Sequence, residues 1–235
     1  MKEVLIMKLA KLIALIIAVV CLVACFSACG DVVPSVELPK TAEEYCQYAM
    51  DYMAIHAYKM HTKSTTSMSF GQVEDTVDES DTYMDGANMR VEMTLEDCGD
   101  FVITYYNGTI YYKTPFGNKK MAGADQEDIA ALYDGIKTLS ASMLEGVEMT
   151  LTKNDDGTAK VEFSTNLLGE SHYVMEFDKD CRIIKQTLTM DVTVVDITAT
   201  TKWESTIEYG DQYKVSEPAD ADTYVTVDSM TDLLS

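Results

Sequence analysis

Three histidines and three cysteines beyond residue 30 are the side chains best suited to nucleophilic or metal chemistry. The histidines lack the HExxH spacing of a zinc protease, and the cysteines lack the CxxC spacing of a structural zinc site. The chain also contains no GxSxG, SxxK or P-loop motif. We therefore predict no catalytic residue, no metal site, no cofactor and no enzymatic activity. The six residues are His56, His61, His172, Cys46, Cys98 and Cys181.

An odd number of widely spaced cysteines does not define a disulfide framework. Cys98 and Cys181 both fall in expected hairpin turns, which makes them the best candidates for one bridge. We expect the three cysteines to be free, and this bridge is the alternative.

The N-terminal segment has the pattern of an export signal. Lys2, Lys8 and Lys11 precede an uncharged run, and small residues with cysteines follow. This order is typical of a secretory signal peptide. The uncharged stretch 12–30 has 19 residues, so an uncleaved transmembrane helix is the alternative.

Two cysteines near the end of this signal match a lipobox, in which an aliphatic residue, a small residue and Ala or Gly precede the lipidated Cys. The sequences are LVAC ending at Cys25, which matches well, and FSAC ending at Cys29, in which the aromatic Phe26 takes the aliphatic position. We favour Cys29 because the polar chain begins directly after it, and Cys25 is the alternative. The interpretation is a signal peptide at 1–28 and a diacylglyceryl Cys29 at the extracytoplasmic face of the cell membrane. Two acyl chains are enough for stable anchoring.

The part that follows the signal is strongly acidic. Of the 18 Lys and Arg and 39 Asp and Glu, 15 and 38 lie beyond residue 28, which leaves a net charge of −23. Such a surface repels polyanions, so we predict no nucleic-acid partner.

A lipidated tether is expected at 29–40, where two prolines interrupt any helical period. Thr41 and Glu44 form a capping-box pattern that predicts a helix start. Four residues at helical spacing then define an apolar face. These are Tyr45, Ala49, Tyr52 and His56.

Beyond residue 57 the apolar period changes to two, which predicts strands. In 88–95 the odd positions are apolar and are expected to face the helices, whereas Arg90 and Glu92 are expected to face water. Asn107 and Gly108 predict a type I′ hairpin turn. A second helix is expected at 125–145, followed by further hairpins and a long strand at 199–209.

This order of elements, including YYNGTIYYKT and YVMEFDKDCRIIKQ, resembles the LolA-like lipoproteins, which include the LppX-LprG group. The resemblance implies an α+β domain at 41–228, with a C-terminal tail at 229–235. Its expected form is a curved antiparallel sheet, a half-barrel of about nine or ten strands, with two helices covering the concave face.

The resemblance implies a non-enzymatic lipoprotein that binds a lipid or other amphiphile in a cavity of the sheet. One alternative is a sensor or interaction module with a protein partner, as in RseB-like domains. The other is an extracellular enzyme. Because the family has no invariant site to transfer, the ligand-binding residues stay unassigned.

Overall fold

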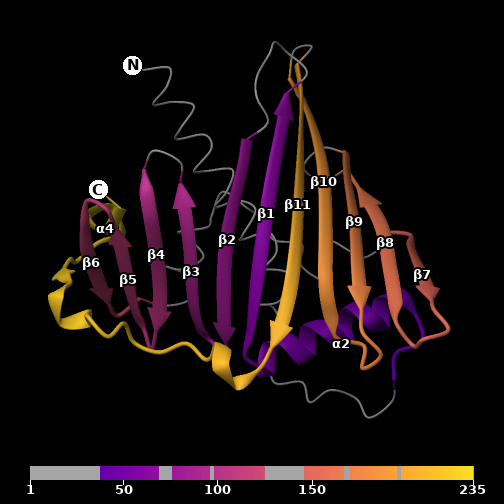
Figure 1. Ribbon diagram of the computed structural model, residues 1–235, viewed down its shortest axis with the longest axis horizontal. Coiled ribbons are helices and arrows are strands. Elements are labelled where there is room, and N and C mark those ends of the chain that lie inside the picture. Colours follow the sequence, from indigo (N-terminus) through magenta and orange to yellow (C-terminus); the bar gives the residue numbers. More distant parts are fainter. Residues whose placement is uncertain are drawn as a thin grey trace.

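The computed structural model describes residues 38–68, 76–95, 98–124, 146–166, 170–194 and 197–234 (Figure 1). The signal peptide, Cys25, Cys29 and the helix expected at 125–145 lie outside these ranges. Within the described ranges, no helix combines the length and apolar character needed to cross a membrane.

The domain is α+β and is built on one sheet of twelve strands, in the order β12-β6-β5-β4-β3-β2-β1-β11-β10-β9-β8-β7. The expected count of nine or ten was therefore wrong, and the sheet is open and uncurled where a half-barrel was expected. The strands are β1 Tyr58–Met68, β2 Thr76–Asp85, β3 Asn88–Leu95, β4 Gly99–Tyr106, β5 Thr109–Thr114, β6 Gly117–Ala122, β7 Met149–Lys153, β8 Ala159–Thr165, β9 Glu170–Phe177, β10 Ile183–Val194, β11 Ile197–Tyr209 and β12 Val225–Thr226.

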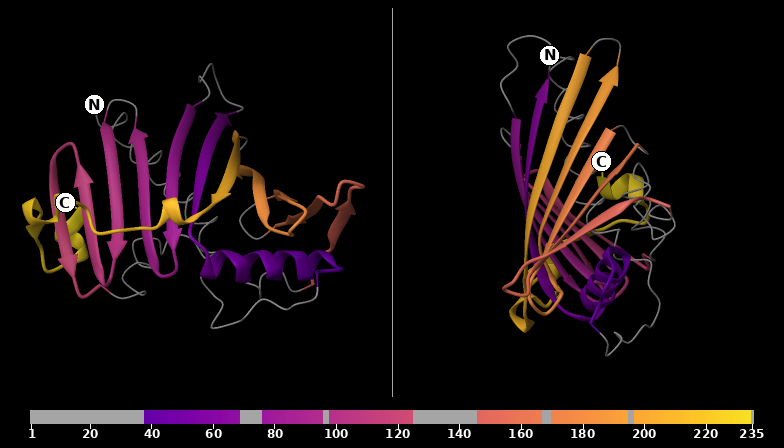
Figure 2. Two further views of the ribbon diagram at one scale, coloured as in Figure 1. Left: turned by 60° about the horizontal axis from the view of Figure 1, so that its bottom comes forward. Right: turned by 90° about the vertical axis from the view of Figure 1, so that its right-hand side faces the viewer.

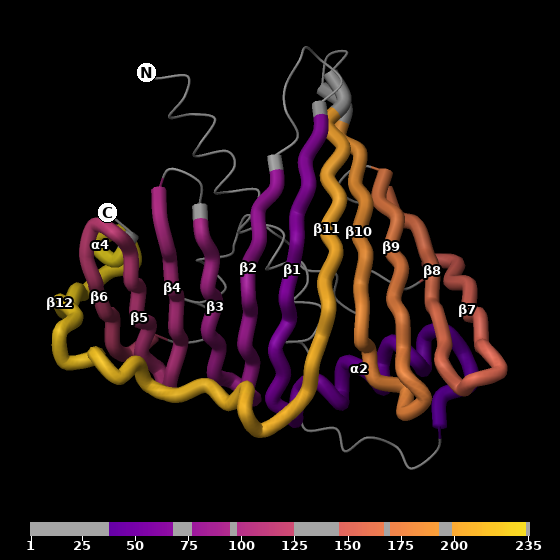
Figure 3. The backbone as a smooth tube through the Cα atoms, in the orientation of Figure 1, coloured from indigo at the N-terminus to yellow at the C-terminus, as the bar shows by residue number. Residues whose placement is uncertain are grey.

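The first and the last long strands meet at the centre of the sheet (Figure 3). β1 pairs antiparallel with β11 along its whole length, from Tyr58 opposite Tyr209 to Met68 opposite Ala199. Two antiparallel meanders, β1 to β6 and β7 to β11, are thereby joined into one surface. Among the strands that the structure describes, the short β12 alone pairs parallel, with β6.

The helix α2 (Ala42–Ile55) begins as the sequence predicts. The Thr41 side chain accepts a hydrogen bond from the Glu44 amide at 3.3 Å, and the Glu44 carboxylate accepts from the Thr41 amide at 3.2 Å. The buried face differs from the expected stripe, because Tyr52 and His56 are only half-buried. Its apolar members are Ala42, Tyr45, Cys46, Ala49, Met50 and Met53.

The alternation expected in β3 is confirmed. Met89, Val91 and Met93 are buried, whereas Arg90 is exposed and Glu92 is half-buried. We call the side of the sheet that carries these buried residues the inner face and the opposite side the outer face. Both α2 and the C-terminal helix α4 (Met230–Leu234) lie on the inner side (Figure 2). 

The hairpin between β4 and β5 also has the expected geometry. Asn107 has a φ of 47° and Gly108 a φ of 78°, as a type I′ turn requires at its two central positions.

The segment after β11 forms a C-terminal strap, residues 210–234. It crosses the ends of β2 to β5 on the outer face and then turns around β6 to the inner face (Figure 1). Residues 229–235, expected only as a tail, contain α4, and its Leu233 is buried against the inner face. The strap also contains two short 3₁₀ helices, η2 Asp211–Tyr213 and η3 Ala221–Thr223.

Candidate ligand-binding face

Two apolar clusters occupy the inner face, one at each end of the sheet. The first, which we call the α2 cluster, contains residues of α2, of β1 and of the four strands from β8 through β11. The second, the α4 cluster, contains residues of α4 and of the four strands from β3 through β6. Both are rich in methionine, a flexible and polarisable side chain that adapts to irregular apolar partners. The buried methionines are Met50, Met53, Met60 and Met175 in the α2 cluster and Met89, Met93 and Met121 in the α4 cluster.

A row of small polar side chains lies between the apolar ends of the inner face, and Met84 packs against both ends beside this row. Ser80 on β2 lies opposite Thr62 on β1, Thr62 lies opposite Ser205 on β11, and Ser205 lies opposite Gln186 on β10. All four side chains are buried. Adjacent strands are about 4.8 Å apart, so the row extends about 14 Å across the sheet. Methionines continue it at both ends: Met93 beside Ser80 and Met175 beside Gln186.

Thr82 and Trp203 are among the buried groups that adjoin this row. Thr82 follows Ser80 at the next inner position of β2, on one side of the row. Trp203, which also belongs to the α2 cluster, precedes Ser205 on β11 and lies on the other side of the row. We call the six residues the polar band. They are Thr62, Ser80, Thr82, Gln186, Trp203 and Ser205.

Only part of the polar band is satisfied internally. The Thr62 and Ser205 hydroxyls share a hydrogen bond of 2.9 Å. Four other polar atoms of the band have no hydrogen-bond partner, although their residues are only 0–4% exposed. Burial of such a group without a hydrogen-bond partner lowers the free energy of unfolding by about 1–3 kcal/mol, because the group is hydrogen-bonded to water in the unfolded chain. Four neighbours of this kind in one region require an explanation. The atoms are Ser80 Oγ, Thr82 Oγ1, Gln186 Nε2 and Trp203 Nε1.

The electrostatic character of the band is that of neutral hydrogen-bond donors. Gln186 Nε2 and Trp203 Nε1 only donate, whereas the Ser80 and Thr82 hydroxyls donate or accept. The inner positions of β1, β2, β10 and β11, as described, include no Lys or Arg. The lysines of these strands are at outer positions, where Lys59 pairs with Asp81 and Lys202 with Glu204. The band can therefore hydrogen-bond acceptor oxygens but offers no positive charge.

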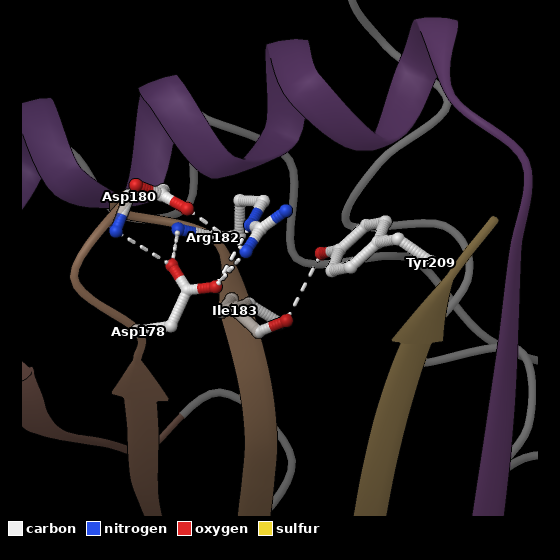
Figure 4. Close-up of polar contacts among 5 residues, drawn as sticks. All are labelled: Asp178, Asp180, Arg182, Ile183 and Tyr209. Atoms are coloured by element: carbon white, nitrogen blue, oxygen red, sulfur yellow. Dashed lines mark hydrogen bonds and ion pairs between the residues drawn. The ribbon is translucent and has the colours of Figure 1, made fainter.

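The turn between β9 and β10 beside α2 is held by a compact polar network (Figure 4). Asp178 Oδ1 accepts from the Asp180 and Arg182 amides, both at 2.9 Å. The Arg182 guanidinium contacts Asp178 Oδ2 at 2.6 Å and Asp180 Oδ2 at 3.0 Å. The Tyr209 hydroxyl donates to the Ile183 carbonyl at 3.0 Å, which ties β11 to the same region.

This network also reaches the helix. The Arg182 guanidinium lies 6.0 Å from the ring centres of both Tyr52 on α2 and Tyr209 on β11. Tyr52 and Tyr209 themselves meet edge to face, with ring centres 5.2 Å apart. The contacts fix one end of α2 over the inner face.

The three cysteines of the described chain, Cys46, Cys98 and Cys181, are all free. The alternative, a bridge between Cys98 and Cys181, does not form. Cys98 directly precedes β4, which starts at the upper edge of the sheet in Figure 1, whereas Cys181 lies between β9 and β10, which meet at the lower edge. Burial raises the pKa of the Cys46 thiol to about 12, with a smaller contribution from Glu43. A thiol with such a pKa is a poor nucleophile at neutral pH.

The three histidines contact three different partners. His56 Nδ1 lies 2.8 Å from the Tyr52 carbonyl, and His61 Nδ1 lies 2.8 Å from Asp81 Oδ1. His172 Nδ1 lies 3.2 Å from Ser164 Oγ. Among the described residues, no group of three or more His, Cys, Asp or Glu side chains is placed to hold a metal ion.

The polar band is absent from the sequence-based predictions. Its signal in the sequence is the recurrence of Ser and Thr at every second position, as in Thr62, Ser64 and Thr66 or in Ser80 and Thr82. Because both faces of these strand segments carry polar residues, the sequence shows no apolar period there. The side that faces inward could therefore not be recognised from the sequence.

No protein-family model and no curated protein matches the chain. Several solved structures are similar to it. The lipoprotein LppX of Mycobacterium tuberculosis shares 10% identity at a TM-score of 0.45, over 74% of this chain and 97% of LppX. A chain of the MucA/MucB complex of Pseudomonas aeruginosa shares 10% identity at a TM-score of 0.40, over 74% of this chain and 61% of that one.

A LolA-superfamily protein from Nitrosomonas europaea shares 9% identity at a TM-score of 0.27, over 72% of this chain and 90% of that one. The similar structures thus include members of the LolA-like and LppX-like group that the sequence resembles.

Proposed function

We propose that this protein is a non-enzymatic lipoprotein of the cell envelope that binds a lipid or another amphiphile on the inner face of its sheet. The observation that carries the proposal is the division of this face into two methionine-rich apolar clusters with a polar band between them. An amphiphile matches such a surface because it combines apolar chains with polar groups. The raised pKa of the Cys46 thiol and the separate histidine contacts support a role other than catalysis.

A test compares ligand carriage by two variants of neighbouring residues on β10. Met190 is half-buried on the inner face against the α2 cluster, whereas Thr189 is half-buried on the outer face. We expect residues 30–235, purified without detergent, to carry bacterial amphiphiles that mass spectrometry detects in an organic extract. Met190→Trp fills space on the inner face and should reduce the bound amount several-fold, and Thr189→Trp should leave it unchanged. A folded domain that carries no amphiphile and takes none up from vesicles of extracted lipid contradicts the proposal.

The anchor is proposed at Cys29, with Cys25 as the alternative acceptor. Cys29→Ala should abolish lipid attachment and leave most of the protein unprocessed, because the lipid is attached to this sulfur before cleavage. Cys25→Ala is the matched control and should be processed normally. Intact-mass analysis of the mature N-terminus distinguishes the two sites. A diacylglyceryl Cys25 followed by Phe26 would show that the choice of Cys29 is wrong.

A second candidate function, the binding of a protein partner, would be favoured by a large exposed apolar patch. The exposed large hydrophobic residues of the described chain come instead from separate segments. They are Leu38, Ile55, Val77, Phe116, Ile184 and Val225.

A further inference from the structure

We propose that the polar band binds the ester carbonyl oxygens of an acylated lipid whose chains lie along the two apolar clusters. This inference rests on the proposed function and adds the ligand's chemical class and the residues that recognise it. It starts from the four buried polar atoms without a partner, on Ser80, Thr82, Gln186 and Trp203.

The donor and acceptor properties of these atoms determine what they can recognise. Trp203 Nε1 and Gln186 Nε2 can only donate, and the Ser80 and Thr82 hydroxyls can both donate. The band therefore matches a ligand with several acceptor oxygens. An ester carbonyl oxygen accepts without donating, so it can bond to any of these four groups.

The charge of the region favours a neutral acceptor over an anionic one. The inner positions described for β1, β2, β10 and β11 carry no Lys or Arg that could compensate a buried phosphate or carboxylate. A buried anion without a cationic partner is costly, whereas a hydrogen-bonded carbonyl is not.

The position of the band between the clusters also matches an acylated lipid. Met93 of the α4 cluster adjoins Ser80, and Met175 of the α2 cluster lies opposite Gln186. In an acyl ester the carbonyl is the first group of the hydrocarbon chain. A carbonyl bound at the band thus places its chain directly on methionine-rich surface.

The test uses the full-length chain, solubilised in detergent, and two probes that differ only in their carbonyl groups. Dioleoylglycerol carries two ester carbonyls, and the matched dioleyl diether has the same chains without them. Native mass spectrometry measures the bound fraction of each. We expect the wild-type chain to bind the diester about tenfold more tightly, which corresponds to one or two hydrogen bonds.

Two isosteric substitutions test the band itself. Thr82→Val and Gln186→Met remove one unpaired group each with little change of shape, and each should lower the preference for the diester about threefold. Binding of the diether should be unchanged. Thr104→Val is the matched control, because Thr104 is buried on the outer face of β4. The melting temperature of each ligand-free variant is measured as well.

The outcomes separate this inference from the proposed function. Equal binding of diester and diether by the wild-type chain overturns the inference and leaves the proposed function standing. Binding of neither probe also overturns the inference, and the carriage experiment with extracted lipids then decides separately on the proposed function. A Thr82→Val or Gln186→Met chain that melts at a higher temperature but keeps the full preference shows that the unpaired groups are only a packing defect, and this also overturns the inference.

Discussion

Met93→Asp is expected to unfold the domain or to lower its free energy of unfolding by about 4 kcal/mol or more. Met93 is 6% exposed on the inner face and belongs to the α4 cluster. The substitution removes an apolar side chain from this cluster. It places a carboxylate among inner positions of β2, β3 and β4 that, in the described strands, carry no Lys or Arg. Chemical denaturation followed by circular dichroism measures the effect, and a low yield of soluble protein is the simplest sign of it.

Glu92→Leu is the matched control, because Glu92 is the preceding residue on the same strand and points to the outer face. It should change the free energy of unfolding by about 0.5 kcal/mol or less. If Glu92→Leu unfolded the chain and Met93→Asp did not, the sheet would be oriented the other way. The assignment of the inner face would then be wrong, together with the polar band defined on it.

Phe177→Ala should cost about 3–5 kcal/mol of unfolding free energy, as large-to-small substitutions of buried aromatic residues do. Phe177 is 0% exposed and lies edge to face with Tyr45 of α2, with ring centres 5.2 Å apart. Its removal leaves a cavity between β9 and α2 and loses the main aromatic contact of the helix in this region. Thermal unfolding followed by tryptophan fluorescence suits the test, since Trp203 belongs to the same cluster.

Phe116→Ala provides the comparison. Phe116 is 85% exposed in the turn between β5 and β6, so its loss should leave the melting temperature within about 2 °C of wild type. Equal melting temperatures for the two variants would show that α2 is not packed on β9 as described.

The strands with an apolar inner face were predictable, and β2 was not. In β3, Met89, Val91 and Met93 alternate with polar residues, so the period of two reveals both the strand and its orientation. In β2 the inner positions include Asp78, Ser80 and Thr82, and most of the outer ones, such as Glu79 and Asp81, are polar too. Such a segment has no apolar period from which a strand could be predicted. It is a strand because it pairs with β1 and β3, and these contacts are not visible in its own sequence. The polar band was missed for the same reason.

The choice of Cys98 and Cys181 as candidates for a bridge used local structure to infer a long-range contact. Cys98 and Cys181 were both expected in hairpin turns, but hairpins turn at either end of a sheet and the sequence does not say which. The complete order of strands decides at which end of the sheet each turn lies, because successive turns of a meander alternate between the two ends. The buried face of α2 was predicted only in part, because it is set by contacts with β8 and β9 that the helical period does not contain.

The C-terminal strap makes the two ends of the sheet unequal. Beyond β6, the strap adds only the two-residue β12, held by the Val227 amide on the Lys120 carbonyl at 2.9 Å, before Leu233 passes to the inner side. At the opposite end, β7 pairs on one side only among the described strands. Strand addition from one molecule to the next needs an unpaired edge of useful length. Among the described strands, β12 offers two residues for this and β7 offers five. Two copies joined through β7 would be related by a twofold axis, because the same edge of each copy would form the contact.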